Sequence, residues 1–137
     1  MSSLTIAAPS LKARRFGLAL LMLAALFLTF DTVVKLLASP EALEGTKALG
    51  WAPGIVRPLG VLCLAMLVLL LVPITAPLGA LLWTGYLGGA VATHVRVGNP
   101  WLSHSLFPVY VASVIWAALW LRDTRVRALT MLPTRRV

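Results

Sequence analysis

The sequence predicts an all-α protein that crosses a membrane four times, as a four-transmembrane-helix bundle with both termini in the cytoplasm. Of its 137 residues, 60% are apolar and 12% are charged, whereas about a quarter of the residues in soluble domains are charged. The apolar residues form four long blocks, each with the ~20 residues that one helical crossing requires. Lipid cannot satisfy backbone hydrogen bonds, so each block must be a helix or a barrel strand. The blocks lack the alternation of barrel strands, which leaves helices.

The chain begins with a polar segment, residues 1–15, which is basic near its end and is predicted to be cytoplasmic. The apolar run that follows is longer than the h-region of a signal peptide and has no A-x-A cleavage site, so we expect an uncleaved first helix over residues 16–38. The pair Ser39-Pro40 ends this helix, because the residue before a proline is disfavoured in helical conformation. Ser39 also suits an N-cap and Pro40 a first helical position, which predicts a short surface helix that stops at Gly50.

The other apolar blocks predict three further membrane helices, over residues 54–72, 77–97 and 102–121. Pro73 ends the second helix, and the short connection makes the second and third helices a tight hairpin. We expect the fourth helix to be irregular in its first turns, because Pro108 cannot donate a hydrogen bond to the carbonyl of His104. Residues 122–137 form a basic cytoplasmic tail, which we expect to be partly disordered beyond Leu129.

The distribution of basic residues predicts the orientation. Three basic residues precede the first helix and five follow the fourth, whereas at most four lie on the opposite side. Lys and Arg are enriched in cytoplasmic segments, so both termini are predicted to be cytoplasmic. Membrane topology thus accounts for the net charge of +8 without a nucleic-acid partner. The lipid bilayer is the partner that the composition requires.

The cofactor chemistry open to this chain is narrow. Cys63 is the single cysteine and lies within an apolar block, so neither an internal disulfide nor a CxxC pair can form. We interpret it as a small buried hydrophobic residue. The sequence has no flavin, haem or metal motif, and two histidines without matched carboxylates or thiols do not predict a metal site.

Ionisable residues of the membrane helices gather, in this topology, at the outer ends of the helices. Such residues are costly at membrane depth and usually mark a functional site. We therefore predict a ligand-binding site at the outer ends, made by seven residues: Asp31, Lys35, Arg57, Tyr86, His94, Arg96 and His104. No catalytic residue is assigned.

Two interpretations of Asp31 are open at this point. Asp31 and Lys35 are four residues apart in the favourable order for a helical ion pair, which would neutralise this helix end. Alternatively, Asp31 faces the other helices and pairs with Arg57 or Arg96. Each histidine, likewise, is either a hydrogen-bonded structural group or a group that binds a ligand.

The third predicted helix contains Gly85 and Gly89 at the G-x-x-x-G spacing of closely packed membrane helices. We expect both glycines to be packing residues. Arg96 lies seven residues beyond Gly89, within about 20° of it around a regular helix. Arg96 is therefore expected to point toward the packed side.

A family resemblance adds to this interpretation. Residues 84–110, TGYLGGAVATHVRVGNPWLSHSLFPVY, strongly resemble the DoxX-like small membrane proteins of bacteria. Residues 30–36, FDTVVKL, resemble the end of that family's first helix, and residues 121–123, LRD, its exit from the last. The resemblance covers about residues 16–129 and implies a multi-pass protein of the bacterial inner membrane. Some relatives are linked to thiosulfate:quinone oxidoreductase or other membrane redox complexes, which implies a quinone or a redox partner subunit. The resemblance supplies no catalytic residues.

Three functions follow from these observations. The first is a subunit associated with a quinone or a redox complex, in which the outer polar residues donate to the ring carbonyls; the same cations would also suit a small sulfur oxyanion. The second is a small proton-coupled transporter that uses Asp31 as its membrane acid. The third is a non-catalytic scaffold subunit, in which the polar residues only fix helix register. A homo-oligomer or a complex is expected in each case, and whether the protein is an enzyme stays open.

Overall fold

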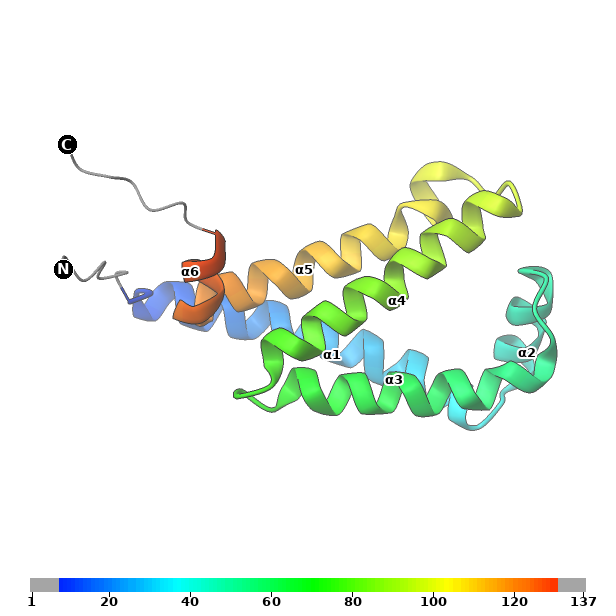
Figure 1. Cartoon of the computed structure of the whole chain (residues 1–137), viewed down its shortest axis with the longest axis horizontal. Coiled ribbons are helices and arrows are strands. Elements are labelled where there is room, and N and C mark those ends of the chain that lie inside the picture. Colours follow the sequence, from blue (N-terminus) through cyan, green and yellow to red (C-terminus); the bar gives the residue numbers. More distant parts are fainter. Residues whose placement is uncertain (1–7, 131–137) are drawn as a thin grey trace.

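The computed structural model describes residues 8–130, and no strand occurs in that range. Its four long helices run side by side: α1 (Leu11–Leu36), α3 (Val56–Leu71), α4 (Ala76–Arg96) and α5 (Phe107–Arg122). Each of them packs against two others, in the cyclic order α1, α3, α4, α5 (Figure 1). The prediction of an all-α protein is confirmed.

Four shorter elements complete the described chain: α2 (Pro40–Ala48), the 3₁₀ turn η1 (Pro53–Ile55), the π-helical turn η2 (Trp101–Ser105) and α6 (Thr124–Thr130). The predicted surface helix is confirmed as α2, which starts at Pro40 and is capped by Ser39, whose Oγ accepts the N–H of Ala42 at 3.3 Å. The predicted irregularity near Pro108 is also confirmed, because η2 precedes α5 and Pro108 lies in the first turn of α5.

The chain ends differ from expectation. Helix α1 begins at Leu11 rather than residue 16, because the Ser10 hydroxyl caps it by accepting the N–H of Ala13 at 3.2 Å. After α5 the chain forms α6, which the sequence did not predict; the Asp123 carboxylate accepts the N–H of Arg125 at 2.8 Å at its start. The disorder expected beyond Leu129 lies almost entirely outside the described residues.

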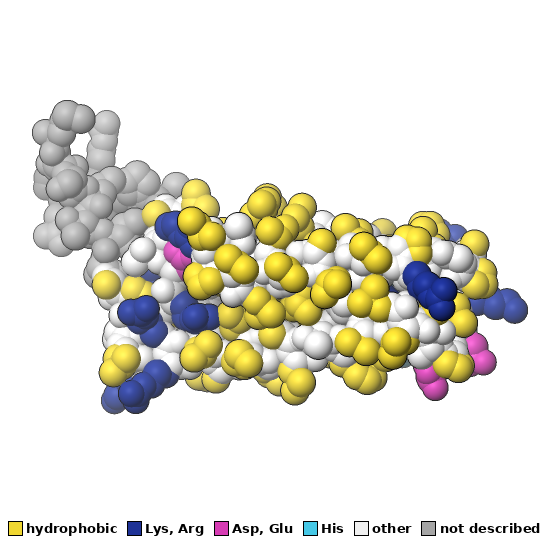
Figure 2. All heavy atoms as spheres, turned by 90° about the horizontal axis from the view of Figure 1, so that it is seen from below, with side chains coloured by type: hydrophobic (Ala, Val, Ile, Leu, Met, Phe, Trp, Pro, Cys, Tyr) yellow, Lys and Arg dark blue, Asp and Glu magenta, His cyan; other side chains and the backbone are white. Residues whose placement is uncertain are grey.

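Within residues 8–130, three helical segments are long and apolar enough to cross a membrane: Leu11–Leu36, Pro53–Leu71 and Trp101–Arg122. Helix α4, which has 21 residues, is not among these segments. Apolar side chains cover the middle of the face shown in Figure 2, and charged side chains lie toward its two ends. This distribution is typical of a protein surrounded by lipid.

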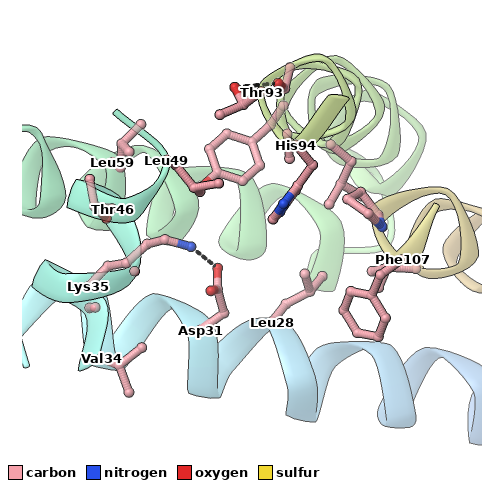
Figure 3. A pocket seen from close by; sticks show the side chains of 18 of the residues that line it. Leu28, Asp31, Val34, Lys35, Thr46, Leu49, Leu59, Thr93, His94 and Phe107 are labelled. Carbon is pink, nitrogen blue, oxygen red and sulfur yellow. Dashed lines mark hydrogen bonds and ion pairs between the residues drawn. The ribbon is translucent and has the colours of Figure 1, made fainter. Parts of the chain in front are cut away.

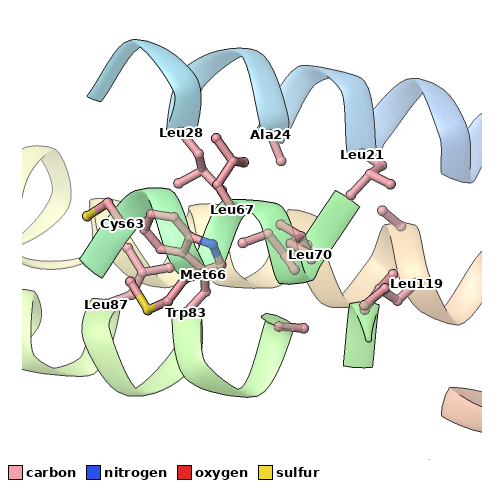
Figure 4. Close-up of a cluster of buried hydrophobic side chains, with 14 of the residues drawn as sticks. Leu21, Ala24, Leu28, Cys63, Met66, Leu67, Leu70, Trp83, Leu87 and Leu119 are labelled. Atoms are coloured by element: carbon pink, nitrogen blue, oxygen red, sulfur yellow. The ribbon is translucent and has the colours of Figure 1, made fainter. Parts of the chain in front are cut away.

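The core lies where the four long helices meet (Figure 4). Trp83 is the largest fully buried side chain and belongs to a cluster with Leu28 of α1 and Cys63 and Met66 of α3. Cys63 is fully buried, as expected of a small hydrophobic residue. Among the described residues, the indole N–H of Trp83 is the one buried side-chain polar group without a hydrogen-bond partner.

Close helix packing depends on glycines in three helices: Gly17 in α1, Gly60 in α3 and Gly79 in α4. A Cβ atom at Gly79 would lie 2.4 Å from the backbone nitrogen of Leu70, and one at Gly60 would lie 2.7 Å from that of Leu36. Glycine is therefore needed where the helix backbones come this close.

The prediction that Gly85 and Gly89 are packing residues is wrong. A Cβ atom at either position would have no neighbouring atom within 4 Å. The physical reason is the geometry of the α3–α4 hairpin: the two helices touch at Gly79, near the turn, and diverge away from it (Figure 1). By Gly85 the face that carries these glycines no longer meets another helix.

Candidate functional site

A cavity of about 690 Å³ lies among the helices at the end of the bundle where α2 is found. Residues of α1 to α5 line it, and its size is within the ~300–1,000 Å³ of small-molecule sites. Most of its wall is apolar, with aromatic and aliphatic side chains that include Phe27, Leu28, Trp83, Leu87, Phe107 and Val111. Such a wall suits a ligand that is largely apolar.

The polar part of the wall is centred on the Asp31–Lys35 pair of α1. The Lys35 ammonium donates to the Asp31 carboxylate, so the structure supports the ion pair within α1 rather than a pair with Arg57 or Arg96 (Figure 3). The Lys35 side chain is 16% exposed and that of Asp31 29% exposed. Two opposite charges thus neutralise each other at the cavity.

Tyr86 extends the polar wall onto α4. Its ring lies edge-on to Trp83, with 5.5 Å between ring centroids, and the Lys35 ammonium is 5.6 Å from the centre of the Tyr86 ring. This distance is within the range of a cation–π contact. Tyr86 therefore links the charged pair of α1 to the aromatic core.

His94 borders the cavity from α4, across from the Asp31–Lys35 pair (Figure 3). Its Nδ1 lies 2.8 Å from the side-chain nitrogen of Asn99. An amide nitrogen donates and does not accept, so Nδ1 is the acceptor and the ring proton is on Nε2. His94 has a structural hydrogen bond and also keeps one N–H donor on its other side.

The other three predicted site residues do not line the cavity. His104 is exposed; its ring lies 6.0 Å from that of His94, and its Nδ1 is 2.8 Å from the Ser103 hydroxyl. Arg57 is exposed at the start of α3. The structure thus brings Asp31, Lys35, Tyr86 and His94 to one cavity and leaves the two arginines and His104 outside it.

The expectation that Arg96 points toward the packed side is wrong. Arg96 is exposed and its guanidinium donates to the Leu49 carbonyl at 2.6 Å. The guanidinium is also 6.0 Å from the Trp51 ring. Since α4 has no packed neighbour on this face near its end, the arginine reaches the connection that follows α2 instead.

Helix α2 supplies a wall that the sequence analysis missed. Its residues Ala42, Gly45 and Thr46 line the cavity, together with Glu41 and with Leu49, which directly follows the helix. Positions 42, 45, 46 and 49 follow the i, i+3, i+4, i+7 spacing of a helix face that packs inward. That spacing is the signal in the sequence for a helix face that packs inward, whereas the predicted surface helix implies contact with solvent only.

The fold and the apolar helices define a multi-pass integral membrane protein. Comparison with family models then gives the particular group: the chain belongs to the DoxX-like family, whose model matches residues 19–118. The resemblance inferred from the sequence is confirmed, and the match includes the four cavity residues of the predicted site. A search of curated proteins and a search of solved structures found no match.

Proposed function

We propose that this protein is a four-span protein of the bacterial inner membrane, with both termini cytoplasmic, which binds a quinone in its cavity as part of a membrane redox complex. The observation that carries the proposal is the cavity itself, because it combines an apolar wall with a small group of polar side chains. Sites of this composition bind ligands that are apolar over most of their surface.

The four-span topology is supported by the length and position of α4. Its 21 residues extend for ~32 Å at 1.5 Å per residue, which matches the ~30 Å of a hydrocarbon core. Helix α4 also packs between α3 and α5. A Cβ at Gly17 would lie 2.7 Å from Arg122, so the basic start of α1 and the basic end of α5 lie at the same end of the bundle. The positive-inside rule makes that end cytoplasmic.

The quinone assignment is supported by the polar groups. A quinone ring presents two carbonyl acceptors, and the cavity offers the Lys35 ammonium and the Nε2–H of His94 as donors, with the Tyr86 hydroxyl, which also hydrogen-bonds with the Cys63 thiol, as a third. The Asp31 carboxylate, held by Lys35 near the end of α1, is poorly suited to the proton-coupled transport alternative, which uses sites near the membrane midplane.

The test is quinone binding by the purified protein in nanodiscs. Trp51 and Trp83 line the cavity, so saturable quenching of tryptophan emission by ubiquinone-1 is expected. Tyr86→Phe and His94→Ala should each weaken binding about tenfold, the ~1.4 kcal/mol of one good hydrogen bond. Arg57→Met is the control and should bind as the wild type does. Absence of saturable binding, with the protein folded, refutes the quinone assignment and leaves the scaffold function.

Association with a redox complex needs a separate measurement. Membranes that contain the protein are solubilised in mild detergent, the protein is purified, and quinone-dependent oxidoreductase activity is assayed in the purified fraction. Activity that copurifies with the wild type and with Arg57→Met supports the association. A purified protein that binds quinone but carries no such activity refutes it.

A further inference from the structure

The wall of the cavity formed by Gly85 and Gly89 is open. Both glycines line the cavity and both are exposed on the surface of the molecule. A Cβ at either position would meet no atom within 4 Å. The cavity therefore reaches the outside of the bundle across these two residues.

This opening lies at the level of lipid chains. Gly85 is near the middle of α4 (Ala76–Arg96), and Gly89 is one turn farther along. If α4 spans the membrane, as proposed above, the middle of the helix is at the middle of the hydrocarbon core. The hydrocarbon chain of a ligand that passes over the two glycines would therefore enter lipid and not water.

The charges at the cavity do not favour a charged ligand. Asp31 and Lys35 form an ion pair with each other, the third charged group of the wall, Glu41, is exposed, and Arg96 is bound to the Leu49 carbonyl outside the cavity. The anion-binding arginines that a sulfur oxyanion would need are thus absent from the wall among the described residues. The Lys35 ammonium equally disfavours a cation beside it, and a lone charge is costly in an apolar site.

The hydrogen-bond donors at the cavity determine which kind of polar head group a ligand can have. The Lys35 ammonium has three N–H groups and Asp31 accepts from one of them, while His94 offers its Nε2–H and Tyr86 its hydroxyl. A head with carbonyl, ester or hydroxyl oxygens can accept these bonds without carrying charge. A volume of about 690 Å³ fits one drug-sized molecule, that is, the head and the first part of one chain.

We infer that the cavity binds a neutral single-chain amphiphile, whose oxygen-bearing head lies between the Asp31–Lys35 pair and His94 and whose chain leaves over Gly85 and Gly89 into the lipid. The inference rests on the same cavity as the proposed function and adds the ligand class and the exit route. It holds for a quinone and for any other neutral head with one chain.

Leucine at Gly89 tests the exit route, because its side chain would occupy open space and block the opening. Gly88→Leu is the matched control: a Cβ there also meets nothing within 4 Å, but Gly88 does not line the cavity. The probes, titrated into nanodiscs, are decylubiquinone, monolaurin and the anionic laurate. The inference predicts saturable binding of the neutral probes, at least tenfold weaker binding in Gly89→Leu, a change of less than twofold in Gly88→Leu, and no saturable laurate binding.

Each deviation has a separate meaning. Binding of monolaurin but not of decylubiquinone refutes the quinone function and supports the inference. Equal binding of decylubiquinone by the Gly88 and Gly89 variants refutes the exit route and leaves the quinone function standing. Laurate binding tighter than monolaurin refutes the neutral ligand class, and failure of both neutral probes to bind the folded wild type refutes both proposals.

A second measurement avoids a bulky side chain. Gly89→Cys and Gly88→Cys place one thiol each on the surface, while Cys63 is fully buried; alkylation is run at alkaline pH, because a thiol at the level of lipid chains ionises poorly. Bound monolaurin should slow alkylation of Gly89→Cys by N-ethylmaleimide at least fivefold and leave Gly88→Cys unchanged. Equal rates with and without saturating monolaurin at both positions overturn the exit route.

Discussion

Replacing Gly79 with alanine is expected to weaken the α3–α4 hairpin, although alanine is the better helix former. The new Cβ would lie 2.4 Å from the backbone nitrogen of Leu70, where ordinary contact begins at 3.4 Å, so the helices must move apart by about 1 Å. The atoms that this Cβ would meet are backbone atoms of Leu69 and Leu70, which cannot swing away as the end of a flexible side chain can. Overpacking of this kind destabilises by ~1–3 kcal/mol. The gain in helix propensity from glycine to alanine, ~1 kcal/mol, offsets part of this loss.

Gly88→Ala isolates the contact, because it brings the same gain in propensity at a position where a Cβ meets nothing within 4 Å. The difference between the two variants in free energy of unfolding is therefore predicted to be ~1–3 kcal/mol, with Gly79→Ala the less stable. Both are unfolded in mixed micelles of increasing SDS content and followed by far-UV circular dichroism. Equal stability of the two variants would show that the close approach at Gly79 does not hold the hairpin together.

Three further changes have defined outcomes. Thr84→Val removes the hydroxyl that accepts the Trp116 indole N–H at 2.8 Å; we expect a loss of ~1 kcal/mol in the same SDS assay, and no loss would contradict the bond. Ser39→Ala removes the α2 cap and should speed amide exchange in α2 by about fivefold, for ~1 kcal/mol of capping. The Arg125 guanidinium lowers the pKa of Asp123 below its usual 3.8, so this carboxylate stabilises the start of α6 above pH 3.8 and the contribution is lost as pH falls through the lowered pKa. Amide exchange in α6 should rise in that acid range in the wild type and show no such step in Asp123→Asn.

Local features of the chain were predictable from sequence because their causes are local. The cap of α2 follows from Ser39 and Pro40, and the π-helical turn before α5 follows from a proline that lacks an N–H. Long apolar blocks predicted four spans, and three of them have the length and composition of membrane helices in the described part of the structure. The ion pair of Asp31 and Lys35 was predictable as one of two interpretations, since spacing alone permits it.

Features that depend on how helices diverge were not predictable. Gly85 and Gly89 have the spacing of packing residues, but spacing does not say whether a neighbouring helix is still within reach. The direction expected of the Arg96 side chain is wrong for the same reason, because it was inferred from the packed face on which Gly89 was expected to lie. Its partner, the carbonyl of Leu49, lies 47 residues away in sequence and belongs to a short connection, where side-chain patterns contain no signal for a backbone acceptor.

The cavity lies beyond the point where α4 diverges from α3. At the turn between α3 and α4, Gly79 lets the two backbones touch. One turn farther along, Trp83 is buried among the helices, and it meets Tyr86 edge-on at 5.5 Å. In the wall of the cavity, Phe27 of α1 meets Phe107 of α5 edge-on with 5.3 Å between ring centroids. These rings pack beyond the glycine contact, so α3 and α4 touch at one end of the bundle and leave room for a ligand at the other.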